Sequence, residues 1–178
     1  MRKIILGAGI SLDGYAARAD GGIDFLYQPK GYSMAAFFET IDAVVFGRKT
    51  FDEALKRGGG SYRQQGKMPA YVFSKSVQAG KHDGVVFVGE SPAEFVGRLR
   101  KEPGQDIFVM GGGELARSFL QDDVVDELYL GVYPLLLGAG IPFFPGGFAQ
   151  RDFRLVESKS YGQGFPALTY ERERQASR

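Results

Sequence analysis

Three short motifs combine glycine, cationic and hydroxyl residues in a way that suits anion binding. The first and third of them open predicted helices, where free backbone amides and the positive end of the helix dipole attract negative charge. Glycine also lets the backbone approach a phosphate without a side chain in the way. Taken one by one, such motifs are more often a solvated helix start, a loop and a tight packing turn, and it is their joint occurrence in this order that favours an anion site. The motifs are Gly47-Arg48-Lys49-Thr50, Phe73-Ser74-Lys75-Ser76 and Gly111-Gly112-Gly113.

Each motif follows a predicted strand, and the strands alternate with predicted helices over most of the chain. Apolar runs predict strands over 3–11, 42–46, 70–74, 85–88 and 106–110. Helices are expected over 32–40 with Ser33 at the N-cap, 48–57, 91–101 with Ser91 at the N-cap and Pro92 first, and 114–120. Because the carboxyl ends of parallel strands meet at one edge, the motifs should share a site for a dinucleotide that carries a 2′-phosphate.

After Asp126 the pattern changes to alternating strands, predicted over 127–134, 153–161 and 166–173. The expected fold is therefore α/β: three layers, a mostly parallel central sheet with helices on both faces, and an antiparallel C-terminal extension. The absence of a linker or repeat indicates a single domain over 1–178, with a disordered tail at 173–178. The apolar connection from Leu135 to Gly147 fits either a core hairpin or a subunit seam.

Composition excludes several classes of function. Lys and Arg number 22 against 21 Asp and Glu, so no excess of positive charge predicts nucleic-acid binding. Cysteine is absent and His82, placed in a polar loop, is the one histidine, so we expect no thiol chemistry and no metal site. No apolar stretch approaches the ~20 residues that span a membrane, and Ile4 to Ile10 fits a strand better than a signal peptide. We expect a cytoplasmic protein.

Two nucleotide-binding fingerprints fail on inspection. Gly7-Ala8-Gly9 begins like the Rossmann pattern, but Leu12 stands where its third glycine belongs. Lys49-Thr50 ends like a phosphate loop, but Ala43 replaces the first glycine of that motif. The residues therefore favour neither a Rossmann domain nor a nucleoside-triphosphatase.

A set of motifs in fixed order resembles a known family over nearly the whole chain, from Lys3 to about Arg172. They are Ser11-Leu12-Asp13-Gly14, Asp20-Gly21-Gly22-Ile23-Asp24-Phe25, Gly47-Arg48-Lys49-Thr50-Phe51, Gly111-Gly112-Gly113-Glu114-Leu115, Asp126-Glu127-Leu128 and 134–144. This order resembles the dihydrofolate-reductase-like superfamily. It is most similar to the bacterial branch that resembles the C-terminal reductase domain of the riboflavin-biosynthesis deaminase/reductase.

The resemblance implies that NADPH binds in an extended form along the strand ends. Its implied contacts run from the nicotinamide to the 2′-phosphate end. They are Ala8, Gly9 and Ala16 at the nicotinamide; Met110, Gly111, Gly112, Gly113, Glu114 and Leu115 at the pyrophosphate; Gly47, Arg48, Lys49 and Thr50 at the 2′-phosphate end; Phe73, Ser74, Lys75 and Ser76 at the adenosine ribose; and Gly89 and Glu90 near the adenine. The resemblance also favours a homodimer.

Catalysis would need hydride from the cofactor and a proton from the protein or solvent. Asp24 is the candidate proton donor, because its loop would cover the nicotinamide, although Asp24 also fits a turn or helix cap. Phe25 and Phe37 are candidates to line a flat substrate ring, and Phe37 equally fits a core position. The small-molecule substrate would be a pterin- or pyrimidine-like heterocycle.

Two departures from the family bear on the substrate. Residues 32–38 carry no carboxylate where dihydrofolate reductases bind the pterin, and Gly47 to Phe51 differs from the loop usual in riboflavin-pathway reductases. Reduction of 5-amino-6-(5-phosphoribosylamino)uracil is nonetheless an alternative. So are a non-catalytic NADP-binding or regulatory protein, and a structural homodimer with a vestigial pocket.

Overall fold

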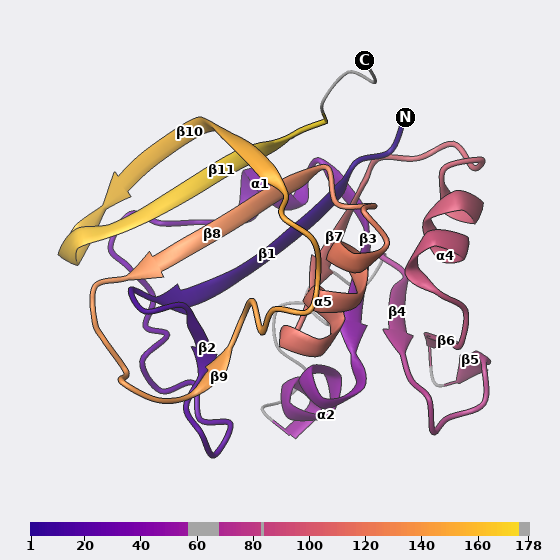
Figure 1. Ribbon diagram of the computed structural model, residues 1–178, viewed down its shortest axis with the longest axis horizontal. Helices are drawn as coiled ribbons and strands as arrows, with labels where there is room; N and C mark the ends of the chain where they lie inside the picture. The colour runs from indigo at the N-terminus through magenta and orange to yellow at the C-terminus, as the bar shows by residue number, and fades with distance from the viewer. Residues whose placement is uncertain (57–67, 83, 175–178) are drawn as a thin grey trace.

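The computed structural model describes residues 1–56, 68–82 and 84–174. The end of the predicted helix 48–57 and residues 175–178 of the predicted tail lie outside the described residues. Within the described part, the chain folds as α/β with one large sheet between two helical layers (Figure 1). The three-layer architecture predicted from the sequence is confirmed.

Nine strands of the described residues form the central sheet, in the order β10-β11-β8-β1-β7-β3-β4-β6-β5. Neighbours are parallel from β8 through β1, β7, β3 and β4 to β6, and antiparallel at both ends. The strands are β1 (Ile4–Ser11), β3 (Ile41–Gly47), β4 (Ala70–Phe73), β5 (Gly80–His82), β6 (Val85–Val88), β7 (Asp106–Met110), β8 (Glu127–Tyr133), β10 (Asp152–Tyr161) and β11 (Phe165–Glu173).

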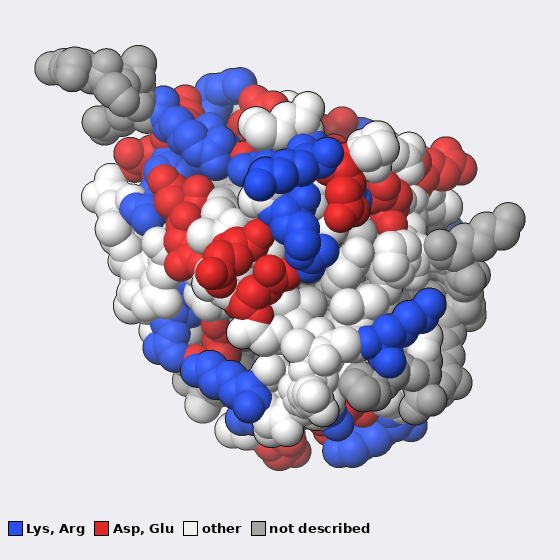
Figure 2. Space-filling view, turned by 90° about the vertical axis from the view of Figure 1, so that its right-hand side faces the viewer, with Lys and Arg blue, Asp and Glu red and all other residues white. Residues whose placement is uncertain are grey.

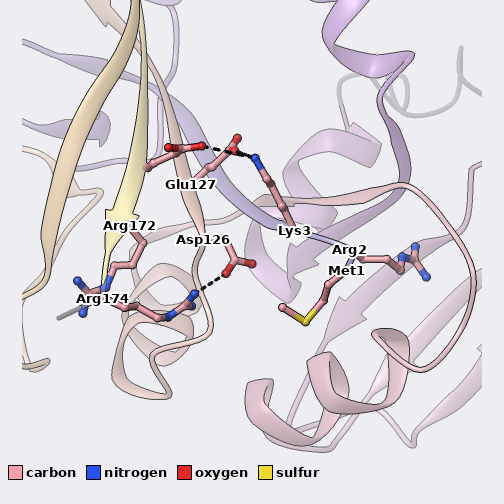
Figure 3. A pocket seen from close by; sticks show the side chains of 8 residues that line it. Met1, Arg2, Lys3, Asp126, Glu127, Arg172 and Arg174 are labelled. Carbon is pink, nitrogen blue, oxygen red and sulfur yellow. Dashed lines mark hydrogen bonds and ion pairs between the residues drawn. The ribbon is translucent and has the colours of Figure 1, made fainter. Parts of the chain in front are cut away.

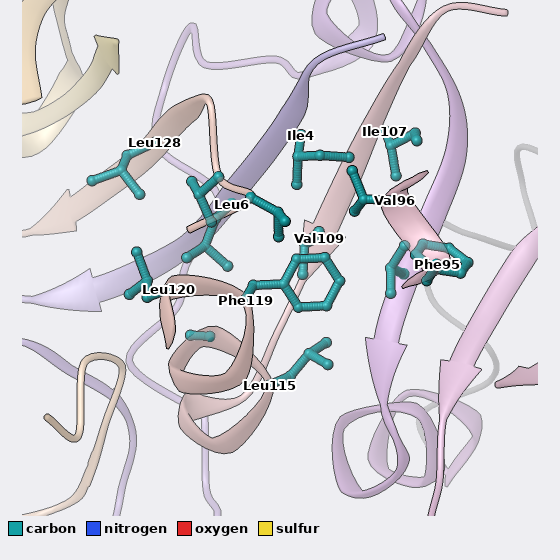
Figure 4. Close-up of a cluster of buried hydrophobic side chains, with 14 of the residues drawn as sticks. Ile4, Leu6, Phe95, Val96, Ile107, Val109, Leu115, Phe119, Leu120 and Leu128 are labelled. Carbon is teal, nitrogen blue, oxygen red and sulfur yellow. The ribbon is translucent and has the colours of Figure 1, made fainter. Parts of the chain in front are cut away.

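Each face of the sheet is closed by a pair of helices, because successive side chains of a strand point to opposite faces. Ile4 and Leu6 of β1 join Phe95 of α4 and Phe119 of α5 in one fully buried core (Figure 4). Ile5 belongs to the core on the opposite face, which α1 and α2 cover. The helices are α1 (Ala35–Phe38), α2 (Arg48–Lys56), α4 (Pro92–Leu99) and α5 (Gly113–Gln121).

Local sequence explains where α4 begins. The Ser91 hydroxyl accepts a hydrogen bond from the Glu94 amide, and the Glu94 carboxylate accepts one from the Ser91 amide. Pro92 occupies the first turn, where its missing amide costs nothing. The predicted cap and first residue of this helix are confirmed.

The first helix is shorter than predicted. Only Ala35–Phe38 is helical, and Met34 rather than Ser33 is the N-cap. The Ser33 hydroxyl still accepts a hydrogen bond from the Ala35 amide at 3.2 Å, so the hydroxyl serves the turn that leads into the helix. The prediction of a helix over 32–40 with Ser33 as its cap was therefore wrong in its bounds.

Three short strands were missed. β2 (Tyr15–Ala17) and β9 (Ile141–Pro142) form a separate antiparallel pair, which joins the loop after β1 to the connection after β8. β5 pairs with β6 and includes His82, which was predicted to lie in a loop. All three are too short for periodicity to reveal.

The C-terminal strands extend the sheet beyond β1. β8 is parallel to β1 on one side and antiparallel to β11 on the other, so it is an interior strand and not only part of an antiparallel extension. Phe143, in the connection that follows, is 0% exposed. Leu136 and Ile141 of the same connection are 71% and 42% exposed, so the core alternative holds for Phe143 and the subunit seam stays a prediction. β11 continues through Glu173, and Arg174 pairs with Asp126 at 3.0 Å, so the predicted disordered tail is ordered at these two residues.

Charges of both signs are interspersed on the face shown in Figure 2, rather than gathered into a field of one sign. No helix within residues 1–56, 68–82 and 84–174 is long and apolar enough to cross a membrane. In the same ranges no three His, Cys, Asp or Glu side chains gather as a metal site would require.

Candidate cofactor site

The predicted cofactor residues lie along one edge of the parallel sheet, at the carboxyl ends of five consecutive strands. The order β1-β7-β3-β4-β6 places the ends of these strands side by side. With about 4.8 Å between neighbouring strands, the row from β1 to β6 is roughly 19 Å long. The topology therefore brings motifs that lie far apart in the chain into one continuous row.

The starts of α2 and α5 meet in the middle of this row. A Cβ added at Gly47 would lie 3.5 Å from the Leu115 Cβ, and one added at Gly112 would lie 3.0 Å from the Thr50 Oγ1. Both helices begin directly after adjacent strands, β3 and β7. Two positive helix ends thus converge on one place, which is the arrangement that binds phosphate groups.

Packing accounts for part of the glycine run. A Cβ at Gly113 would stand closer than 3.0 Å to the Pro142 carbonyl oxygen, so a larger residue cannot fit without moving the backbone. Gly111 is less confined, since its nearest neighbours would stay at 3.4 Å. The tight-turn interpretation is correct for Gly113. It is compatible with anion binding, because Gly112 is the N-cap of α5 and has no side chain to satisfy the first-turn amides.

Two cations begin α2, and they differ in their surroundings. Arg48 makes an ion pair with Asp52, one turn later, at 2.9 Å, and its guanidinium lies 5.5 Å from the centre of the Phe87 ring. Lys49 is exposed. Arg48 is therefore held towards β6, whereas Lys49 faces solvent at the start of the helix.

At the ends of β4 and β6, local contacts occupy two of the predicted residues. The Ser74 hydroxyl accepts hydrogen bonds from the amides of Ser76 and Val77, at 3.3 and 3.1 Å, and so fixes the turn after β4. Glu90 pairs with Arg98 of α4, which neutralises a carboxylate beside the proposed path of a phosphorylated ligand. Lys75 and Gly89 are exposed.

The end of the row where the nicotinamide is predicted to bind is formed by β1 and β2. Ala8 and Ala16 are half-buried and pack against the core that contains α4 and α5. A Cβ at Gly9 would come within 2.9 Å of the Tyr133 ring and 3.1 Å of Leu26. Glycine at position 9 therefore allows the loop after β2 to lie close against β1.

The candidate proton donor sits in an exposed loop. Asp24 is 66% exposed and forms a two-pronged ion pair with Arg18, with N–O distances of 2.6 and 2.8 Å. A backbone turn from Arg18 to Gly22 holds this loop together. Both carboxylate oxygens accept hydrogen bonds from Arg18, so a role in proton transfer would require the pair to open first.

An aromatic cluster packs between α1, with the loop before it, and the strands β8 and β11. Phe37 stacks on Tyr129 with ring centres 4.7 Å apart. Phe25 is buried and meets Tyr133 edge-on at 6.0 Å, and Tyr32 packs against Phe165 at 4.8 Å. Burial raises the pKa values of Tyr129 and Tyr133, so both phenols stay neutral.

Phe25 and Phe37 are thus both part of packed aromatic layers, as the core alternative predicted for Phe37. Their contact with a substrate stays a prediction. Tyr129 and Tyr133, the β8 residues against which Phe37 and Phe25 pack, were not among the predicted site residues. Alternation in this strand predicts that Tyr129 and Tyr133 share the face opposite to Leu128 and Leu130. It does not predict which loop covers that face.

A shallow hollow of about 270 Å³ lies at the opposite edge of the sheet, around the start of β1 (Figure 3). Its charges pair with one another: Lys3 with Glu127 and, at 3.7 Å, with Glu171. Arg174 pairs with Asp126 in the same way. These contacts tie β1, β8 and β11 together, and the hollow is far from the candidate site.

Comparison with known proteins places this fold in a family. The RibD C-terminal domain model matches residues 2–166. Two relatives from Bacillus subtilis (strain 168), the uncharacterized proteins YwjB and YyaP, are 36% and 28% identical to this chain. The matches cover 91% and 95% of this chain, respectively, and 94% of each relative.

Solved structures agree with this placement. A putative riboflavin biosynthesis protein from Shewanella sp. PV-4 has a TM-score of 0.84 and 27% identity, over 97% of this chain and 99% of that one. A pyrimidine reductase-like protein from Corynebacterium diphtheriae, 17% identical, shares the fold with a TM-score of 0.72 over 98% of this chain and 93% of that one. A third structure also shares the fold, with a TM-score of 0.72 and 16% identity over 96% of this chain and 56% of that one. It is a diaminohydroxyphosphoribosylaminopyrimidine deaminase/5-amino-6-(5-phosphoribosylamino)uracil reductase from Thermotoga maritima. The chain belongs to the RibD C-terminal domain family.

Proposed function

We propose that this protein is an NADPH-dependent reductase of a small heterocycle. The observation that carries the proposal is the convergence of the α2 and α5 starts at adjacent strand ends, where Gly112 and Thr50 come into close approach. The first turn of α5 has no capping side chain and can donate its amides to a pyrophosphate. Bound there, the cofactor would supply hydride, and the protein would supply orientation and a dry surface.

The preference for NADPH over NADH is proposed to come from the start of α2. Arg48 and Lys49 place two positive charges beside the end of β4, where Ser74 and Lys75 form the next turn. Asp52 holds the Arg48 guanidinium in one position, which reduces the entropy lost when that guanidinium binds a phosphate. NADH carries no 2′-phosphate for these cations.

The substrate is proposed to be a flat pterin- or pyrimidine-like ring. Aromatic side chains of α1 and β8 face each other next to the nicotinamide end of the row, and α1 itself carries no acidic residue. Phe37 and Tyr129 already stack on each other, so a substrate ring would lie beside this pair and be positioned by aromatic contacts more than by a carboxylate. Asp24 remains the proposed proton donor, on condition that its ion pair with Arg18 opens when the ligand binds.

A second candidate is reduction of 5-amino-6-(5-phosphoribosylamino)uracil. Membership of the RibD C-terminal domain family favours it. That substrate carries a phosphate, and Arg18 and Lys30 are the cations of the loop before α1 that could receive it. Arg18 is paired with Asp24, so phosphate binding and release of the proposed proton donor would be coupled.

The role of Arg48 can be tested by comparing two variants of the same helix. We expect Arg48→Ala to weaken NADPH binding at least about tenfold, the loss of one charge-assisted phosphate contact, and to change NADH binding much less, as measured by calorimetry. Lys56→Ala removes a cation from the far end of α2, where Lys56 pairs locally with Glu53 at 2.6 Å. This control should leave both affinities unchanged.

Equal losses of NADPH and NADH affinity in Arg48→Ala would contradict the 2′-phosphate role. A substrate panel then separates the catalytic alternatives: oxidation of NADPH by pterins or pyrimidines supports the leading proposal, and oxidation by the phosphoribosylated uracil alone supports the second. Tight NADPH binding without oxidation by any of them would favour the non-catalytic alternative.

A further inference from the structure

Asp13, in the turn between β1 and β2, binds a segment that lies far away in the sequence. Its Oδ1 atom accepts hydrogen bonds from the Ser11 hydroxyl at 2.6 Å and from the Leu137 amide at 3.1 Å. Its Oδ2 atom accepts one from the Gly138 amide at 2.8 Å. Leu137 and Gly138 belong to the connection between β8 and β9. One carboxylate therefore joins two segments that are 124 residues apart.

The hydroxyl that orients this carboxylate is itself held in place. Ser11 is 0% exposed, and its Oγ accepts a hydrogen bond from the Tyr15 amide at 3.0 Å while it donates one to Asp13. The Ser11 hydroxyl and, to a smaller extent, the two amides of the connection hold the pKa of Asp13 below its ordinary value, so the carboxylate is charged at neutral pH. A charged acceptor binds amides more strongly than a neutral one.

The turn that contains Asp13 contacts the connection at three places. Backbone hydrogen bonds join the Leu12 amide to the Leu135 carbonyl oxygen at 2.9 Å and the Phe143 amide to the Gly14 carbonyl oxygen at 3.0 Å. The Asp13 carboxylate binds the part of the connection between these two points. The connection ends in β9, which pairs with β2 beside the carboxyl end of β1 (Figure 1). Asp13 is thus the side chain that fastens the segment leading into β9.

β9 contacts two parts of the strand-end row. On one side it pairs with β2, which includes Ala16, a predicted nicotinamide contact. On the other side Pro142 of β9 and the nearby Pro145 lie against Gly113, at the start of α5, where the pyrophosphate is predicted to bind. The place of β9 therefore sets how β2 and the start of α5 lie relative to each other.

We propose that Asp13 is a positioning residue of the cofactor site, which acts through β9 and fixes the nicotinamide part of the row relative to the pyrophosphate part. The inference rests on the proposed NADPH site, and it requires no contact between Asp13 and the cofactor. Hydride transfer depends steeply on geometry, since a displacement of about 1 Å can cost about a hundredfold in rate. A residue that holds β2 in place therefore matters to the reaction without touching the reacting atoms.

A positioning role and a purely structural role differ in which ligands they affect. Loss of a general structural contact lowers stability and either spares all ligands or weakens them alike. Loss of Asp13 as a positioning residue acts on the nicotinamide half of the site, because β2 lies at that end. The adenosine half, at the ends of β4 and β6, should be unaffected, since β9 does not pair with those strands.

Calorimetry with two ligands separates the two halves. NADPH spans the whole row, whereas adenosine 2′,5′-bisphosphate has only the adenosine half. We expect Asp13→Ala to weaken NADPH binding about tenfold and to change adenosine 2′,5′-bisphosphate binding less than about twofold. Asp13→Asn keeps one oxygen but places an amide group against the Gly138 N–H, so its NADPH affinity should lie between those of wild type and Asp13→Ala.

Asp106→Ala is the matched control. Asp106 begins β7, at the opposite edge of the sheet, and also accepts a hydrogen bond from the amide of a distant residue, Lys3, at 2.8 Å. Its removal should leave both affinities unchanged.

Three results would overturn the proposal in distinguishable ways. Unchanged NADPH affinity in Asp13→Ala would remove the positioning role, and equal losses for both ligands would show a general structural role instead. A wild-type protein that binds neither ligand would overturn the proposed NADPH site itself, and this inference with it. Should Asp13→Ala fail to fold in thermal melting, Asp13→Asn carries the same comparison.

Discussion

The same substitution, glycine to alanine, should have opposite effects at two helical positions. At Gly113 the new Cβ would stand closer than 3.0 Å to the Pro142 carbonyl oxygen and 3.3 Å from Pro145 Cδ. Because the nearest atom belongs to the backbone, the clash can be relieved only if α5 or the β9 segment moves. We expect this to lower the free energy of unfolding by about 3 kcal/mol, the upper part of the range for overpacking. For a chain of this length that corresponds to a fall in Tm of about 6–12 °C.

Gly97, in the middle of α4, is exposed and has open space where a Cβ would be added. Alanine there should gain about 0.5–1 kcal/mol from helix propensity and raise Tm by about 1–4 °C. Thermal melting of both variants beside wild type is the assay. A neutral Gly113→Ala variant, or changes of the same sign at both positions, would refute the argument that β9 fixes the start of α5.

Two further predictions concern pH. The Ser91 amide and hydroxyl both donate hydrogen bonds to the Glu94 carboxylate and hold its pKa below the ordinary 4.5. The stability advantage of wild type over Glu94→Ala should therefore be full above pH 4.5 and fade as the pH falls through the folded-state pKa. Denaturant melts across pH measure this, and an advantage that persists in acid would contradict it. Burial raises the pKa values of Tyr32, Tyr71, Tyr129 and Tyr133 above 10.0. These four of the nine tyrosines should therefore ionise above pH 10 in the folded protein, and their contribution to stability should be lost as the pH rises from 10. Ultraviolet titration of all nine tyrosines near pH 10 in the folded state would contradict their burial.

Strong local signals made most of the fold predictable. A continuous apolar run such as Val44 to Phe46 predicts a strand that is buried on both faces of the sheet. Ser91-Pro92 followed by Glu94 predicts a helix start, because the Ser91 and Glu94 side chains can each bond the other residue's amide. The missed β2–β9 pair shows the limit of such signals. Tyr15 lies opposite Pro142, far along the chain, and strands of two or three residues leave no periodic trace.

The candidate site was predictable as a set of strand ends but not in its side-chain contacts. The sequence predicted Gly47, Ser74 and Gly111 at strand ends on one side of the sheet, and the topology shows that these ends are neighbours. It did not show that Gly113 is constrained by Pro142, because that contact depends on a distant connection in the chain. The Arg48–Asp52 pair, by contrast, has helical i, i+4 spacing, so its ion pair could have been predicted from the sequence.

Binding of NADPH along the strand ends is best tested by calorimetric titration of the purified protein with NADPH and NADH. Calorimetry is preferred because the chain has no tryptophan to report binding by fluorescence. We expect micromolar binding of NADPH and clearly weaker binding of NADH. Absence of binding by either dinucleotide would contradict the cofactor site and, with it, the proposed reductase.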